Sequence, residues 1–206
     1  MNRKRTLIGI GILVLLAVVA VSPILAQRNN PGGSIETVLQ GLEPGTLSSE
    51  EEAGILLMRE EEKLARDVYL TLYEKWNIPV FANIAESEET HMDSMKLLIE
   101  RYGLVDPVSD ESREFRGTYA NDEFEELYAE LIARGLSSYT EALEVGALIE
   151  DLDIADLQKL IAGSGNDDVR VVYQNLLKGS RNHMRSFTRQ LQRYGQEYTP
   201  EYISIS

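Results

Sequence analysis

The sequence predicts an all-α protein: an antiparallel four-helix bundle with an extra short helix between its second and third long helices. Four long segments carry apolar residues three or four positions apart, as on one face of a helix, and no segment shows convincing strand alternation. Clusters of helix-breaking residues, rich in glycine, asparagine and proline, separate these segments. Short connections of this kind favour antiparallel packing of consecutive helices.

The first two long helices have recognisable start and stop signals. Ser48 and Glu51 have the spacing of a capping box, which predicts that the first helix begins there. We expect this helix to end near Trp76, because an Asn-Ile-Pro sequence follows. The second helix is expected to begin near Pro79, which suits a first helical turn, and to end at Gly103.

The rest of the chain is organised in the same way. Residues 104–120 are expected to form a loop, and a short amphipathic helix that ends at Gly135 follows it. A second capping box opens the third long helix, which is expected over 138–163. The fourth is expected over about 167–194 and ends before a glycine. The bundle domain is therefore expected to span 48–206.

The N-terminal segment is expected to lie outside this domain. A basic head, Arg3-Lys4-Arg5, precedes an almost wholly apolar run that ends at Ala26. Residues 1–26 predict either a secretory signal peptide cleaved after Ala26 or an N-terminal membrane anchor. Because the basic flank stays inside, both readings place the remainder extracytoplasmic, either secreted or anchored to the outer face of the cytoplasmic membrane. Residues 27–47, which are polar and rich in Gly, Pro and Asn, predict a flexible linker.

Charge and cysteine content narrow the function classes. The chain has 20 basic and 34 acidic residues, and three of the basic ones lie within 1–26, so the remainder has a net charge of −17. Such an acidic surface repels phosphate backbones, and no nucleic-acid partner is expected. There is no cysteine, which excludes disulfides, thiolate metal sites and thiol chemistry.

Polar residues interrupt the apolar face of each long helix near its middle. A buried carboxylate is costly unless it is paired or binds a cation, and these faces carry no Lys or Arg to pair with it. A metal site between the helices would compensate the charge, and a hydrogen-bonded polar layer is the alternative. The candidate ligands are Glu62, Glu88, His91, Glu150 and His183. Whether Glu61 or Glu62 faces the core stays open, because three consecutive glutamates begin at residue 60.

The two histidines of the chain occupy matching places in its two halves. Glu88 and His91 form a Glu-x-x-His motif, which puts a carboxylate and an imidazole side by side on one helix face. Two such helices, each assisted by a Glu from another helix, build a dinuclear carboxylate site in a four-helix bundle. The second copy is incomplete, because Ser180 stands three residues before His183 where the carboxylate is expected.

At these residues the chain resembles the ferritin-like superfamily, and rubrerythrins in particular. The first-helix pattern of rubrerythrins, Glu-x-x-Ala-Arg-x-x-Tyr, is matched in order by Glu62, Ala65, Arg66 and Tyr69, and their second-helix Glu-x-x-His by Glu88 and His91. Over about 50–200 the chain is most similar to the domain of unknown function 2202 family, for which the stretches 60–69 and 179–183 are characteristic.

The resemblance implies a ferritin-like fold that binds two iron ions. It implies terminal ligands at Glu62 and Glu150, a bridging Glu88, and one imidazole on each ion from His91 and His183. In the family a fourth-helix Glu supplies a second bridge, which Ser180 cannot replace because a hydroxyl is a poor ligand for Fe(II) beside carboxylates. Asp153, one turn beyond Glu150, is a candidate to supply a carboxylate to the site instead. A single ion held by Glu62, Glu88 and His91 is the competing arrangement, and Mn or Zn are alternatives to Fe.

The function implied is that of an exported di-iron or di-manganese oxidoreductase, a peroxidase for example, that acts on O₂ or peroxide. Because the chain has no cysteine for a rubredoxin-type iron, electrons would come from a separate donor protein. The alternative is a non-catalytic helical bundle that binds one structural metal or none and acts as an extracytoplasmic interaction module. A membrane tether and a homodimer both stay open.

Overall fold

The computed structural model describes residues 34–203. This part of the chain is all-helical, with seven helices and no strand. The predicted signal peptide or membrane anchor, 1–26, lies outside the described residues. Among the helices of 34–203, none is both long enough and apolar enough to cross a membrane.

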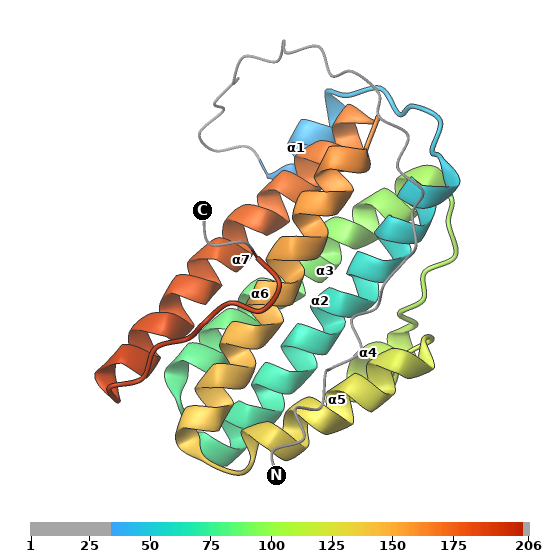
Figure 1. Cartoon of the computed structure of the whole chain (residues 1–206). Helices are drawn as coiled ribbons and strands as arrows, with labels where there is room; N and C mark the ends of the chain where they lie inside the picture. The colour runs from blue at the N-terminus through green and yellow to red at the C-terminus, as the bar shows by residue number, and fades with distance from the viewer. Residues whose placement is uncertain (1–33, 204–206) are drawn as a thin grey trace. The chain divides into compact units, whose positions relative to one another are not determined.

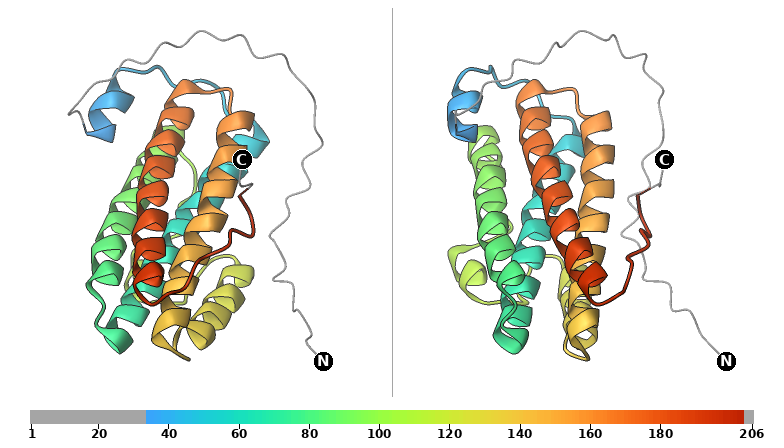
Figure 2. Two further views of the ribbon diagram at one scale, coloured as in Figure 1. Left: turned by 60° about the vertical axis from the view of Figure 1, so that its left-hand side comes forward. Right: turned by 90° about the vertical axis from the view of Figure 1, so that its left-hand side faces the viewer.

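Four long helices run side by side: α2 (Ser49–Trp76), α3 (Pro79–Tyr102), α6 (Tyr139–Gly163) and α7 (Asp167–Arg193). Helix α2 packs along α3, and α6 packs along α7 (Figures 1 and 2). The two pairs meet through α2 against α6 and through α3 against α7. Only 77–78 and 164–166 separate the members of each pair, so the paired helices run in opposite directions.

The ends of these helices confirm the predicted boundaries to within a residue or so. At the start of α2, Ser48 Oγ accepts from the backbone N–H of Glu51, and the Glu51 carboxylate accepts from the backbone N–H of Ser48, so the capping box is complete. Asn77 ends α2 and Gly103 ends α3, both with a positive φ, 51° and 65°. This left-handed conformation is a common helix stop that glycine adopts at little cost.

The shorter helices include one that was predicted and two that were not. Helix α5 (Asp122–Gly135) confirms the predicted short helix and packs against α2 and α6. Helix α4 (Asp110–Glu114) lies within the segment predicted to be a loop. Helix α1 (Ile35–Gln40) lies within the predicted flexible linker 27–47 and buries Leu39 in the core. The described part of that linker is therefore partly helical and packed, and a helix of six residues is too short to show periodicity in the sequence.

Inside the four long helices, an apolar layer lies on each side of the middle level along the helix axes. On one side lie aromatic rings from three helices: the centroids of Tyr69 and Phe81 are 5.3 and 5.5 Å from that of Phe187. Phe187 lies so close to Gly146 of α6 that a side chain at that position would overlap its ring. The layer on the other side includes Met58, Met95, Ile154, Leu157, Val172 and Leu176. The polar residues singled out in the sequence occupy the helix positions between these layers.

Candidate metal centre

Five buried ionisable side chains converge between the long helices. They are Glu62 of α2, Glu88 and His91 of α3, Glu150 of α6 and His183 of α7, each at most 8% exposed. Their donor atoms form two groups, and within each group all the atoms lie within 4.8 Å of one another. The first group is Glu62, Glu88 and His91, and the second is Glu88, Glu150 and His183. The structure thus brings all five predicted residues together in two sets that share Glu88.

Glu88 lies between the two imidazoles. Its Oε2 is 2.7 Å from Nδ1 of His91, and its Oε1 is 2.8 Å from Nδ1 of His183. Each imidazole also faces a second carboxylate: Nδ1 of His91 is 3.2 Å from Glu62 Oε2, and Nδ1 of His183 is 3.5 Å from Glu150 Oε2. The ring centroids are 5.6 Å apart. One carboxylate therefore offers one oxygen to each half of the cluster.

Three neighbouring residues fix the orientation of these side chains. Nε2 of His183 is 3.0 Å from Ser87 Oγ, so the hydroxyl can hold the outer nitrogen of the ring while Nδ1 faces the cluster. The hydroxyl of Tyr69 donates to Glu150 Oε1 at 2.6 Å, which leaves Oε2 on the side of His183. The outer edge of the His91 ring lies against Gly179, where a Cβ would overlap it. The roles of Ser87 and Gly179 were not predicted, because neither contact can be read from spacing within one helix.

All three consecutive glutamates of α2 are buried, in different surroundings. Glu60 Oε1 accepts from the backbone N–H groups of Ala120 and Asn121, ahead of α5. Glu62 contacts His91, as described above. Neither oxygen of Glu61 has a hydrogen-bond partner within the described chain, and Glu61 belongs to neither donor group. Of the two candidates left open by the sequence, Glu62 is the member of the cluster.

Burial and mutual charge shift the pKa values of the whole cluster. Burial raises the pKa of Glu62 to about 7, and burial together with the charge of Glu88 raises the pKa of Glu150 to about 7. Burial also acts to raise the pKa of Glu88, but the two imidazoles outweigh it and hold that pKa well below its usual range. Burial lowers the pKa of His183, and the charges of Glu150 and Glu88 outweigh this and raise it to about 10. The carboxylates thus favour the protonated form of both imidazoles by raising their pKa values, and the imidazoles favour the ionised form of Glu88.

The donor set fits a divalent metal ion. Carboxylate oxygens and imidazole nitrogens are common ligands of Fe, Mn and Zn, and Glu62 Oε1 is buried with no hydrogen-bond partner in the described part of the chain. Buried cations do occur in α2, but their partners are acids outside the cluster. The pairs are Arg59 with Asp106, Lys63 with Asp67, and Arg66 with Asp67 and Glu89. Within 34–203, no Lys or Arg forms a salt bridge with the five residues.

Ser180 occupies the position at which a fourth carboxylate was expected. Its side chain is buried, and its hydroxyl donates to the carbonyl of Leu176 in the same helix at 2.9 Å. Ser180 is a member of neither donor group. The structure thus shows the second half of the cluster without a carboxylate from α7.

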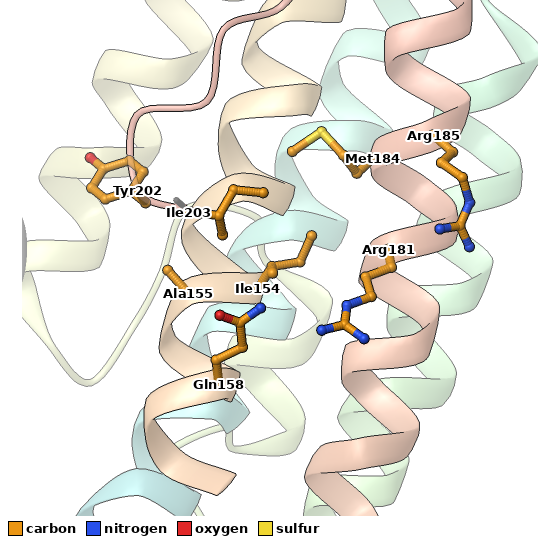
Figure 3. Close-up of a pocket in the computed structure, with 8 residues that line it drawn as sticks. All are labelled: Ile154, Ala155, Gln158, Arg181, Met184, Arg185, Tyr202 and Ile203. Atoms are coloured by element: carbon orange, nitrogen blue, oxygen red, sulfur yellow. The ribbon is translucent and has the colours of Figure 1, made fainter. Parts of the chain in front are cut away.

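A pocket of about 540 Å³ lies between α6, α7 and the segment that follows α7 (Figure 3). That segment is fastened to Asp151 of α6, whose carboxylate accepts from the Tyr198 hydroxyl and from the backbone N–H groups of 201–203. The lining residues are Ile154, Ala155, Gln158, Arg181, Met184, Arg185, Tyr202 and Ile203. They include no carboxylate or imidazole, so the pocket is separate from the buried cluster.

The fold and the cluster together define an all-helical protein with a buried carboxylate–imidazole centre. Residues 51–206 match the uncharacterized protein domain DUF2202, and the chain belongs to this family. The match confirms the family predicted from 60–69 and 179–183.

The chain is similar to the uncharacterized protein MJ0754 of Methanocaldococcus jannaschii. The identity is 58% over 158 residues, which cover 77% of this chain and 84% of that protein. The crystal structure of the hypothetical protein MJ0754 from Methanococcus jannaschii superposes with a TM-score of 0.76 at 56% identity. This match covers 79% of the present chain and 91% of the other.

Proposed function

We propose that the four long helices are a ferritin-like four-helix bundle of the rubrerythrin type. We further propose that the protein is an exported di-iron or di-manganese oxidoreductase acting on O₂ or peroxide. One observation carries the proposal: two donor groups, each with a terminal carboxylate and an imidazole, share the carboxylate of Glu88. A carboxylate shared by two metal ions is the arrangement of dinuclear carboxylate sites in helical bundles.

Each residue of the cluster has a distinct role in this proposal. Glu62 and His91 would hold one ion, Glu150 and His183 the other, and Glu88 both. When bound, such a pair supplies one electron per ion to O₂ or peroxide. The apolar layers on both sides of the cluster exclude bulk water, which strengthens electrostatic interactions inside it.

The chain carries no thiolate ligand for a second iron centre. Because there is no cysteine, an internal rubredoxin-type iron is excluded, and electrons would come from a separate donor protein. The basic head and apolar run of 1–26 support export, by cleavage or as a tether. The excess of acidic residues favours no nucleic-acid partner.

A second function is favoured by the contacts among the five residues themselves. Glu88 is within 2.8 Å of both imidazoles, and the raised pKa of His183 keeps that ring cationic at neutral pH. The cluster could thus satisfy its own charges as a structural polar layer, with one stabilising metal or none. The protein would then be a non-catalytic interaction module.

Reconstitution of the full-length chain in detergent distinguishes the two functions. Metal-free protein is incubated anaerobically with Fe(II) or Mn(II), and bound metal is measured by elemental analysis. Consumption of O₂ and of peroxide is then followed with a chemical reductant in place of the donor protein. The proposal predicts about two ions per chain and turnover that Glu88→Gln abolishes. Bound metal without turnover would favour the structural function, and a protein without metal would refute the oxidoreductase.

A further inference from the structure

The two helix pairs place corresponding residues at corresponding positions. In the first pair Glu62 of α2 contacts His91 of α3, and in the second Glu150 of α6 faces His183 of α7. In the second pair, Gly146 lies against Phe187, one turn away toward the aromatic layer. This contact has the same register as the pairing of Glu150 with His183. Antiparallel helices keep such a register, since three residues forward on one helix match three residues back on the other.

One turn in the other direction, the residues that this register places opposite each other differ between the two pairs. In the first pair it brings Ala65 of α2 opposite Glu88 of α3. In the second it brings Asp153 of α6 opposite Ser180 of α7. Each pair thus has one carboxylate and one small residue at this level, but the carboxylate of the second pair is on the other helix.

Asp153 is a buried carboxylate without a counter-ion in the described part of the chain. The side chain is 6% exposed, and its Oδ1 has no hydrogen-bond partner in the described residues. Burial and then the charge of Glu62 raise its pKa well above the ordinary value, and the Ser180 hydroxyl acts in the opposite direction. Asp153 lies one turn from Glu150 on α6 and, in the register described above, opposite Ser180 of α7. No buried Lys or Arg within 34–203 forms a salt bridge with it.

We propose that Asp153 is a metal ligand and supplies, from α6, the fourth carboxylate that α7 lacks. This inference rests on the proposed dinuclear function. Asp153 lies outside both donor groups as the side chains stand, so binding involves a change in its side-chain torsions toward the ion held by Glu150 and His183. Four carboxylates neutralise two divalent ions, whereas three leave one positive charge uncompensated.

Glu61 offers a matched control for this assignment. It is also buried, at 4% exposed, and its oxygens also have no hydrogen-bond partner in the described residues. However, it lies on α2 next to Glu62 and is not opposite Ser180 in the register of α6 and α7. If Asp153 acts as a ligand, neutralising Glu61 should not reproduce the effect of neutralising Asp153.

The test counts Mn(II) ions bound by the full-length chain, from the electron paramagnetic resonance signal of the free ion. The wild type should bind about two ions, and Asp153→Asn should bind one, or bind the second at least about tenfold more weakly. Glu61→Gln should bind as the wild type does. The double variant with Asp153→Asn and Ser180→Glu should recover the second ion, because it returns the carboxylate to α7. Asp153→Ser is measured in parallel, and circular dichroism melts of the metal-free variants establish that each is folded.

The outcomes separate the two proposals. If Asp153→Asn and Asp153→Ser both bind two ions with wild-type affinity, Asp153 is not a ligand. The proposed function would remain unaffected by that result. An equal loss in Glu61→Gln would also overturn it, because the effect would then reflect buried charge in general. A wild type that binds no Mn(II) and no Fe(II) would refute the proposed function itself.

Discussion

The hydroxyl of Ser87 lies 3.0 Å from Nε2 of His183, on the side of the ring opposite the nitrogen that faces Glu88. A hydrogen bond at the outer nitrogen fixes both the tautomer and the orientation of a metal-binding imidazole. The contact crosses from α3 to α7, so one helix pair orients a ligand of the other.

Ser87→Ala should therefore weaken the ion bound by His183 without unfolding the protein. Loss of such an outer contact lowers metal affinity by about tenfold or more, and Mn(II) titration of the full-length chain measures it. Ser94→Ala is the control, because Ser94 is a buried serine of the same helix whose hydroxyl donates to the carbonyl of Thr90 and not to an imidazole. Equal affinities of the two variants would contradict the role given to Ser87.

Gly179→Ala should also reduce metal binding, through His91. The added Cβ would overlap Nε2 and Cε1 of that ring and push it out of its orientation toward Glu62 and Glu88. The control is Gly163→Ala at the end of α6, where an added Cβ meets no atom within 4 Å. Titration should show about tenfold weaker binding for Gly179→Ala alone. If Gly179→Ala bound metal like the wild type, the close contact would have no functional meaning.

Removal of the Tyr69 hydroxyl should destabilise the metal-free protein. Tyr69→Phe leaves Glu150 Oε1 buried without its donor, which costs about 1–3 kcal/mol of unfolding free energy. Tyr173→Phe should change that free energy by less than about 1 kcal/mol, or stabilise, because the buried Tyr173 hydroxyl has no partner in the described residues. Urea unfolding of both variants measures the difference. The interpretation fails if the two substitutions cost the same.

The stability of the protein should depend on pH through Glu51. Burial acts to raise its pKa, but hydrogen bonds from Ser48, Ser164 and Asn166 outweigh this and lower it below the ordinary value of 4.5. Because the folded-state pKa is lowered, the stabilisation is complete above the unfolded pKa and is lost as the pH falls through the folded pKa.

Glu51→Gln should therefore cost about 2 kcal/mol at pH 7, and this difference should shrink below pH 4. Unfolding of wild type and variant between pH 3 and 7 measures the trend. Glu50→Gln is the control, because Glu50 is exposed and precedes Glu51 in the same first turn. A pH-independent difference between wild type and Glu51→Gln would contradict the assignment.

The sequence was sufficient for the elements that depend on local signals. Capping boxes, a proline in a first turn and a glycine after a last turn are read from neighbouring residues, and they located the ends of the four long helices. An amphipathic pattern located α5. Helices α1 and α4 were missed because they are too short for periodicity, and α1 is stabilised by the burial of Leu39.

The candidate centre was predictable only in part. Three acids and two histidines that interrupt apolar helix faces singled out the five cluster residues, and the structure brings them together. The sequence could not decide between Glu61 and Glu62. Both are buried, and only their contacts with other helices distinguish them: Glu62 contacts His91, and Glu61 belongs to neither donor group. The parts played by Ser87 and Gly179 depend on contacts between α3 and α7, which no spacing within one helix reveals.

The most direct test of the central claim is the metal content of the full-length protein after anaerobic reconstitution, compared with that of Glu88→Gln. We predict about two Fe or Mn ions per wild-type chain and a clear loss in the variant, because Glu88 faces both donor groups. No bound metal in the wild type, or the same metal content in both proteins, would contradict the account.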